Sequence, residues 1–110
     1  MTQFSHLFQP IHIGAMDVKN RILMSAMSIN FGVNGHGHVN NQLISYIEER
    51  ANGGAGMILV GGGGVHPGGA ELPDLPALWD DSCIEPLAQM VTAIKPYGCR
   101  LGMQLMHGGR

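Results

Sequence analysis

The sequence ends with the stretch LGMQLMHGGR, residues 101–110, whose first five residues have the pattern of a buried β-strand. A glycine turn follows at residues 108–109, where an α/β fold would continue into a helix. Gln104 shares strand parity with Gly102, opposite to the apolar residues 101, 103 and 105, which are suited to covering helices. We therefore expect the Gln104 amide to face a ligand, and the stretch to belong to the opening piece of a larger α/β protein.

Strands and helices alternate along the rest of the chain. Apolar runs predict buried strands at residues 22–27, 57–60 and 101–105, and residues 10–18 have the alternation and glycine turn of a hairpin. Helical spacing predicts one helix that ends near residue 52 and another that ends near residue 94. Because strands that alternate with helices are normally parallel, this order predicts a parallel sheet with right-handed crossovers.

Local signals set the expected ends of these elements. Asn40 or Asn41 can cap the first helix, and Ser82 with Glu85 fits a capping box at the start of the second. The expected buried stripe of the second helix comprises residues 87, 90, 91 and 94. Four consecutive glycines, residues 61–64, are predicted to open a long loop that runs through Trp79.

Two architectures remain for this order: an open doubly wound sheet, or the first three strands of a (β/α)8 barrel. No domain boundary is visible, so residues 1–110 are predicted to belong to one domain. A complete barrel needs about 250 residues. Three of its strands would leave two open edges and an uncovered interior, so we expect the isolated chain to fold poorly, to aggregate or to depend on further segments.

Composition and charge exclude several classes of protein. The formal net charge is −2 and the 6 Lys and Arg residues are not clustered, which argues against a surface for nucleic acid or anionic membranes. No apolar run approaches the roughly 20 residues of a membrane span, and the N-terminus lacks a secretory pattern. Cys83 and Cys99 form no disulfide framework. A cytoplasmic protein is therefore expected.

Ligands bind at the carboxyl ends of parallel strands in both architectures, here residues 26–28, 61–64 and 104–107. An unpaired buried amide costs roughly 1–3 kcal/mol, so Gln104 would pair either with a flat heterocycle or with neighbouring backbone. The four glycines do not open into a helix as a dinucleotide fingerprint requires. They indicate either close approach to a planar ligand or a plain flexible loop.

The residue spacing predicts neither a metal site nor a catalytic group. His36 and His38 are too close for the usual helix-based pair of ligands, and the cysteines are not spaced to help. No Ser/His/Asp arrangement or nucleophile elbow is visible. No catalytic residue is therefore assigned.

Several segments resemble the Old Yellow Enzyme family, the NADH:flavin oxidoreductases that include the 2,4-dienoyl-CoA reductases. They are LFQPIHIG at residues 7–14, VKNRI at 18–22, WDDSCI at 79–84 and QLMHGGR at 104–110. They occur in the family's order and spacing over essentially the whole chain. The resemblance implies a (β/α)8 barrel that binds FMN at the carboxyl face, with residues 1–110 as its N-terminal part.

The resemblance also implies which residues contact FMN. Ala26, Met27 and Ser28 match the segment at the end of the first strand that lies against the flavin. Gly62 matches the residue whose backbone N–H approaches the flavin's reactive edge, and Gln104 matches the glutamine that pairs with its pyrimidine end.

Two further positions bear on the cofactor and the substrate. Relatives that attach FMN covalently have Cys where this chain has Ser28, which implies noncovalent FMN. Asn30 falls near a position that contacts the substrate in the family.

The implied activity is that of an ene-reductase. NAD(P)H reduces FMN, which then passes hydride to the β-carbon of an activated alkene, a small-molecule substrate of the enoate or dienoyl-CoA kind. In the family, the residues that grip the substrate carbonyl, the flavin phosphate site and any iron–sulfur cluster lie beyond Arg110, and a full-length form could be a homo-oligomer. The alternative is an inactive remnant or an assembly fragment without catalysis of its own.

Overall fold

The computed structural model describes residues 3–70 and 73–109 of the chain. Strands and helices alternate along most of this part, with short 3-10 turns between them. In chain order the elements are β1 (Ile11–Ile13), β2 (Met16–Val18), β3 (Leu23–Met24), α1 (Asn41–Asn52), β4 (Met57–Gly64), η1 (Pro67–Gly69), η2 (Asp81–Cys83), α2 (Ile84–Ile94), η3 (Lys95–Tyr97) and β5 (Arg100–Met106).

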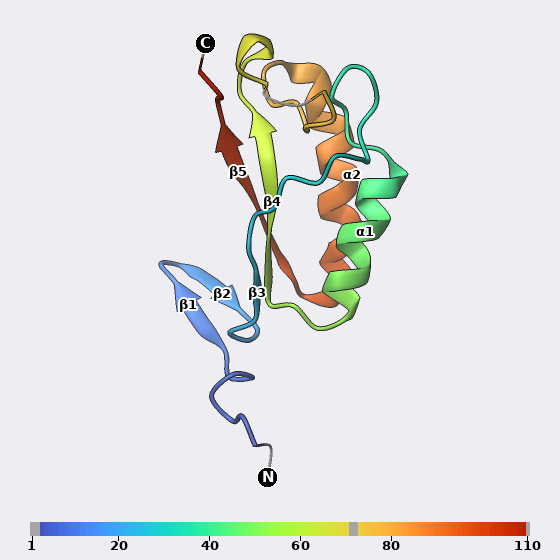
Figure 1. Cartoon of the computed structure of the whole chain (residues 1–110). Helices are drawn as coiled ribbons and strands as arrows, with labels where there is room; N and C mark the ends of the chain where they lie inside the picture. Colours follow the sequence, from blue (N-terminus) through green and yellow to red (C-terminus); the bar gives the residue numbers. More distant parts are fainter. Residues whose placement is uncertain (1–2, 71–72, 110) are drawn as a thin grey trace.

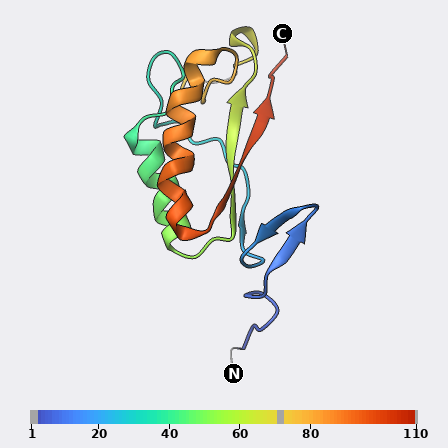
Figure 2. The ribbon, with the colours of Figure 1, turned by 180° about the vertical axis from the view of Figure 1, so that it is seen from behind.

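A parallel sheet forms the centre of the fold. β4 lies between β3 and β5 and pairs in parallel with both, while β1 and β2 form a separate antiparallel hairpin. Figures 1 and 2 show α1 and α2 on the same side of this sheet, with the hairpin near the amino ends of its strands. The predicted α/β class, the parallel strands and the hairpin are confirmed.

Apolar residues of both helices pack against β4 to form the core. The most deeply buried of them are Leu43, Ile47, Ile58, Val60, Met90 and Ile94. Because side chains alternate along a strand, Ile58 and Val60 point to the helices, and Met57 and Leu59 point to the opposite face. The helix-covered face is therefore closed, while no described residue covers most of the other face.

The first strand of the sheet is shorter and less buried than predicted. Residues 22–27 were expected to form a strand covered on both faces, but only Leu23–Met24 pair with β4. Leu23 is 52% exposed and Met27 is 48% exposed. A continuous apolar run is typical of a strand with two covered faces, and here only the face toward the helices is covered. The half-buried residues of this run are Ile22, Met24 and Ala26.

The four glycines belong to β4, so the prediction that they open a loop is wrong. Gly63 and Gly64 pair with Leu105 and Met106 of β5 after an irregularity that begins at Val60. All four glycines are buried. Glycine weakens an isolated strand, but here backbone and side-chain atoms of neighbouring segments lie so close that only a residue without a side chain fits.

The second helix begins with a different cap from the one predicted. The Asp80 side chain, not that of Ser82, accepts a hydrogen bond from the Ser82 backbone N–H at 2.8 Å and starts η2, which runs directly into α2. Because the chain is already helical at Asp81, Ser82 lies inside the first turn. Val91, predicted to be buried, is 49% exposed because it lies at the rim of α2 beside Lys95.

The first helix begins and ends as predicted. Asn40 is its N-cap, and its side chain accepts a hydrogen bond from the Gln42 backbone N–H at 2.9 Å. Gly53 follows its last residue and donates its backbone N–H to carbonyl groups of the final turn. In the described ranges, neither α-helix has the length and apolar content needed to cross a lipid bilayer.

We expect Asn40→Ala to lower the free energy of unfolding by about 1 kcal/mol, because it removes the side-chain acceptor for the Gln42 N–H. Asn40→Asp keeps an acceptor in the same position and should change stability little. Urea unfolding followed by circular dichroism measures both variants. Equal losses in the two variants would show that the effect does not come from the cap.

Candidate functional site

The carboxyl-terminal half of β4 pairs with that of β5, and the segment that follows β3 lies beside the same part of β4. Ser28 follows β3, Gly62 lies in the last half of β4, and Gln104 lies near the end of β5. A Cβ atom built on Gly62 would lie 3.1 Å from Ser28 Oγ, and one built on Gly63 would lie 3.2 Å from the Gln104 carbonyl oxygen. The structure thus brings the segment around Ser28 and the carboxyl-terminal halves of β4 and β5 together.

Gly62 has a conformation and surroundings that require glycine. Its φ angle is +72°, a left-handed value that other L-residues rarely adopt. A Cβ atom on Gly62 would also lie 2.7 Å from Leu75 Cδ2, closer than side chains normally approach. Gly62 is buried, and the space that a side chain would need is taken by Leu75 and by the Ser28 hydroxyl.

The neighbouring glycines bring further backbone close to β4. Gly61 lies against the backbone of Met27. Gly64 donates its N–H to the Pro76 carbonyl at 2.9 Å, and its own carbonyl accepts from the Leu78 N–H at 2.8 Å. This pairing folds the segment around residue 77 along the end of β4, where it forms an isolated parallel bridge.

The other residues expected to contact FMN or substrate lie on the segment after β3. Ala26 is half-buried, whereas Met27, Ser28 and Asn30 are exposed. No hydrogen bond within the described residues involves the Ser28 or Asn30 side chain. Asn30 lies two residues beyond Ser28 and does not line the edge formed with Gly62.

Gln104 differs in one respect from the prediction. Its side chain is exposed, not buried, and it makes no hydrogen bond within the described residues. A Cβ atom on Gly102 would meet Leu59 Cδ2 at 2.6 Å, so the predicted parity of β5 holds at that point. Leu105, expected to be covered by the helices, is 69% exposed because its cross-strand partner Gly63 has no side chain.

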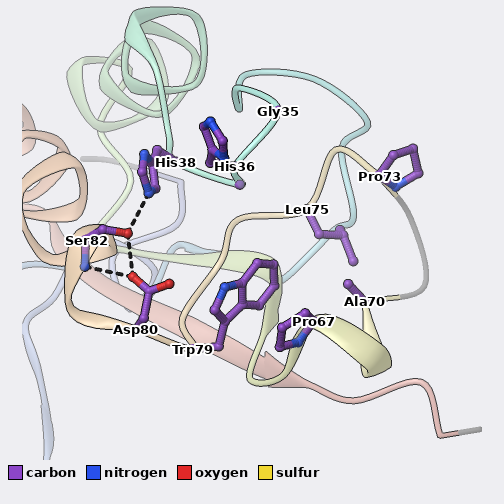
Figure 3. Close-up of a pocket in the computed structure, with 11 residues that line it drawn as sticks. Gly35, His36, His38, Pro67, Ala70, Pro73, Leu75, Trp79, Asp80 and Ser82 are labelled. Carbon is purple, nitrogen blue, oxygen red and sulfur yellow. Dashed lines mark hydrogen bonds between the residues drawn. The ribbon is translucent and has the colours of Figure 1, made fainter.

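A cavity of about 500 Å³ opens between the loops that follow β3 and β4 (Figure 3). Figure 3 shows two imidazoles, an indole and a carboxylate around it. Its lining residues are Gly35, His36, Gly37, His38, Pro67, Ala70, Pro73, Leu75, Trp79, Asp80 and Ser82.

The loop after β3 is held in shape by Asn34. Its side-chain Oδ1 accepts the backbone N–H groups of His36 and His38 at 2.9 and 3.0 Å. The Ala77 N–H donates to the Gly37 carbonyl at 2.8 Å and joins this loop to the segment beside β4. The two imidazoles are therefore carried by a braced turn.

A chain of hydrogen bonds links His38, Ser82 and Asp80 (Figure 3). The Ser82 hydroxyl donates to Asp80 Oδ1, and His38 Nε2 lies 2.8 Å from Ser82 Oγ. Because the hydroxyl proton is used toward Asp80, we infer that His38 Nε2–H donates to Ser82 Oγ. The hydrogen bonds from the Ser82 hydroxyl and backbone N–H lower the pKa of Asp80.

Sequence reasoning missed this hydrogen-bonded chain. His38 and Ser82 are 44 residues apart, and the local pattern assigned Ser82 to the helix cap. The resemblance drew attention to the segment WDDSCI but gave its residues no role. The turn residues around Asn34 were the one available signal that the loop is ordered.

His66 and His107 also come together, with ring centroids 6.0 Å apart. Each Nδ1 accepts a backbone N–H from two residues ahead, Gly68 in one case and Gly109 in the other. These rings therefore help to shape the loops after β4 and β5. Across residues 3–70 and 73–109, no three His, Cys, Asp or Glu side chains are grouped to hold a metal ion.

Residues 6–110 match the model of the NADH:flavin oxidoreductase / NADH oxidase family. The chain is 38% identical over 106 residues to a metal reductase of Desulforamulus reducens, covering 96% of this chain and 15% of that protein. It is 35% identical over 104 residues to the NADPH dehydrogenase of Bacillus subtilis, covering 94% of this chain and 31% of that protein.

Solved structures give the same result. The old yellow enzyme of Trypanosoma cruzi matches with a TM-score of 0.86 and 29% identity, covering 99% of this chain and 29% of that one. A 2-naphthoyl-CoA reductase complexed with 2-naphthoyl-CoA matches with a TM-score of 0.92 and 33% identity, covering 98% of this chain and 16% of that one. The chain thus spans less than a third of the length of these proteins.

We expect Gly62→Ala to lower the free energy of unfolding by at least about 1–2 kcal/mol, because φ is positive and the added methyl group meets Leu75. Gly35→Ala is the matched control, since Gly35 has no positive φ and its added Cβ meets no atom within 4 Å. Urea unfolding of both variants measures the difference. Equal stability of the two variants would contradict the packing described for β4.

We expect Asp80 to stay ionised, and to keep its hydrogen bonds to Ser82, down to a pH below the ordinary pKa of an aspartate. The hydrogen bonds should be lost only when the pH falls through the lowered pKa of Asp80. A carboxyl ¹³C NMR titration of Asp80 measures this pKa. Ser82→Ala removes the hydroxyl donor and should move the pKa back toward its ordinary value. A wild-type Asp80 that titrates like a free aspartate would show that these hydrogen bonds do not form.

Proposed function

The chain belongs to the NADH:flavin oxidoreductase / NADH oxidase family, and on this basis we propose that it supplies the first flavin-contacting strands of an FMN-dependent NAD(P)H oxidoreductase. The observation that carries the proposal is the shared edge of Ser28, Gly62 and Gln104. The Ser28 hydroxyl lies beside Gly62, and the backbone of Gln104 lies beside Gly63, in the carboxyl-terminal halves of the adjacent strands β4 and β5. Such ends are where α/β enzymes bind their ligands.

We propose further that β3, β4 and β5 are the first three strands of a (β/α)8 barrel. The strand order follows the chain order, and both helices lie on one face, whereas a doubly wound sheet has helices on both faces. Leu23 and Met27 remain exposed on the segment at the β3 edge of the sheet. Further strands of a barrel would cover such residues.

The residues at this edge fit an isoalloxazine ring. Gly62 has no side chain of its own, so a flat ring would approach its peptide backbone without meeting a Cβ atom. The Gln104 carboxamide offers both a donor and an acceptor, which match the imide and carbonyl groups of the pyrimidine end. Ser28 offers a hydroxyl but no thiol, which supports noncovalent binding.

Bound FMN would supply hydride transfer from NAD(P)H to an activated C=C bond, of the enoate or dienoyl-CoA kind. The chain's own residues would bind and orient the ring. A hydrogen bond from Ser28 would tune the reduction potential, and Gln104 would fix the ring in its plane. Asn30, exposed on the segment beyond Ser28, is proposed to contact the substrate.

The names of two relatives support this interpretation. These relatives are an NADH oxidase of Thermoanaerobacter brockii, 35% identical over 111 residues, and the NADPH dehydrogenase of Bacillus subtilis. Both names state oxidation of a reduced nicotinamide nucleotide. We propose the same class of reductant for this protein.

We expect Gln104→Leu to weaken FMN binding by roughly tenfold, because the substitution removes a donor and an acceptor for the pyrimidine end. The titration follows flavin absorbance in the chain, or in a longer protein that contains it. Gln89→Leu is the matched control, since Gln89 is exposed on α2 and hydrogen-bonds only to Glu85. Unchanged FMN affinity in Gln104→Leu, or no flavin binding in the parent protein, would refute the site.

A further inference from the structure

The cavity between the loops adjoins the edge at which we propose that FMN binds, but it is a separate space. Leu75 lines the cavity, and its Cδ2 atom lies 2.7 Å from a Cβ built on Gly62. Ser28, Gly62 and Gln104 are not among the lining residues. A volume of about 500 Å³ is within the range of small-molecule sites. The cavity can therefore hold a part of a ligand that extends beyond the flavin edge.

One side of the cavity suits a flat aromatic ring. The Trp79 indole lies beside Pro67, and His36 lies across from it (Figure 3). Nucleic-acid bases stack favourably on aromatic side chains. The His36 ring makes no hydrogen bond within the described residues, so its nitrogens are free to pair with the edge of a heterocycle.

Beside the indole, the cavity wall offers a carboxylate with one oxygen that no described residue pairs with. Asp80 Oδ1 already accepts from the Ser82 N–H and hydroxyl. Asp80 Oδ2 has no partner among the described residues, and Figure 3 shows it on the side of Trp79. A carboxylate beside a stacked base is the arrangement that accepts the hydroxyl groups of an unphosphorylated ribose.

The charge of the cavity argues against a phosphate inside it. The described lining residues include Asp80 but neither Lys nor Arg. A phosphate on the ribose would therefore meet a like charge with no cation to offset it.

We propose that this cavity binds the adenosine end of NADH, with the purine on Trp79 and the ribose hydroxyls on Asp80. The inference rests on the proposed function, because it assigns a second subsite to the reductant. The carboxylate would select NADH over NADPH, which carries a 2′-phosphate, and over coenzyme A, which carries a 3′-phosphate. Leu75 separates the adenosine from the flavin edge.

The single tryptophan of the sequence makes the test direct, because Trp79 is the only indole that can report binding. The chain, or a longer protein that contains it with Trp79 as its single tryptophan, is titrated with AMP while Trp79 fluorescence is followed. Trp79 is half-buried, so an emission that shifts to longer wavelength in urea shows that the cavity is formed at the start. We expect saturable quenching by AMP, and binding of 2′,5′-ADP and 3′,5′-ADP roughly tenfold weaker.

Asp80→Asn tests the carboxylate, since asparagine keeps the capping acceptor for the Ser82 N–H. We expect this variant to lose the preference for AMP over 2′,5′-ADP. Asp74→Asn is the control, because Asp74 lies in the same loop but does not line the cavity, and it should retain that preference. Absence of quenching by AMP in the folded chain would overturn the inference, as would equal or tighter binding of either bisphosphate.

A separate titration with FMN, read in the visible absorbance of the flavin, distinguishes the two proposals. FMN contains no adenosine, so its binding does not depend on the cavity. FMN binding without AMP binding would overturn this inference and leave the proposed function standing. AMP binding without FMN binding would support an adenosine site and count against the flavin site.

Discussion

The close approach of neighbouring segments around Gly61–Gly64 is the constraint on which the rest of the structure depends. The segment after β3 lies on one side of this run, and β5 lies on the other. The chain around residue 77 folds back along its end. A side chain on any of these glycines would meet a neighbouring atom at 3.3 Å or less. The absence of four Cβ atoms is therefore what allows three other segments to converge on the end of β4.

This convergence creates two different environments near the carboxyl end of β4. On one side of Leu75 the peptide edge of Gly62 meets the Ser28 hydroxyl, and a planar ring could lie against both. On the other side Leu75 lines a cavity whose polar groups come from loops far apart in sequence. A ligand with a reacting ring at one end and a base at the other could use both environments. The glycine run thus places the proposed flavin site and the cavity next to each other, on either side of Leu75.

Much of the fold could be predicted because its signals are local. The Asn40 cap, the hairpin turn and the apolar stripe of α1 each depend on residues within a few positions of one another. The glycine strand could not be predicted, because glycine alone favours a loop and only tertiary packing makes it a strand. The link from His38 to Ser82 crosses 44 residues and leaves no local pattern. The strand ends were found through parity and resemblance, while the cavity required the folded loops.

The turn before α2 is capped by Asp80 and not by Ser82, and this difference changes which groups of the two residues face the cavity. With Ser82 as the cap, its hydroxyl would be used on the backbone of the helix and would not be free for His38. With Asp80 as the cap, the same hydroxyl bridges the carboxylate and the imidazole. Asp80 Oδ1 then carries the cap, and Oδ2, on the side of Trp79, has no partner among the described residues. Because the helical turn begins after Asp80 and not after Ser82, the Ser82 side chain lines the cavity and does not cap the helix. Asp80 is also the only carboxylate among the described lining residues.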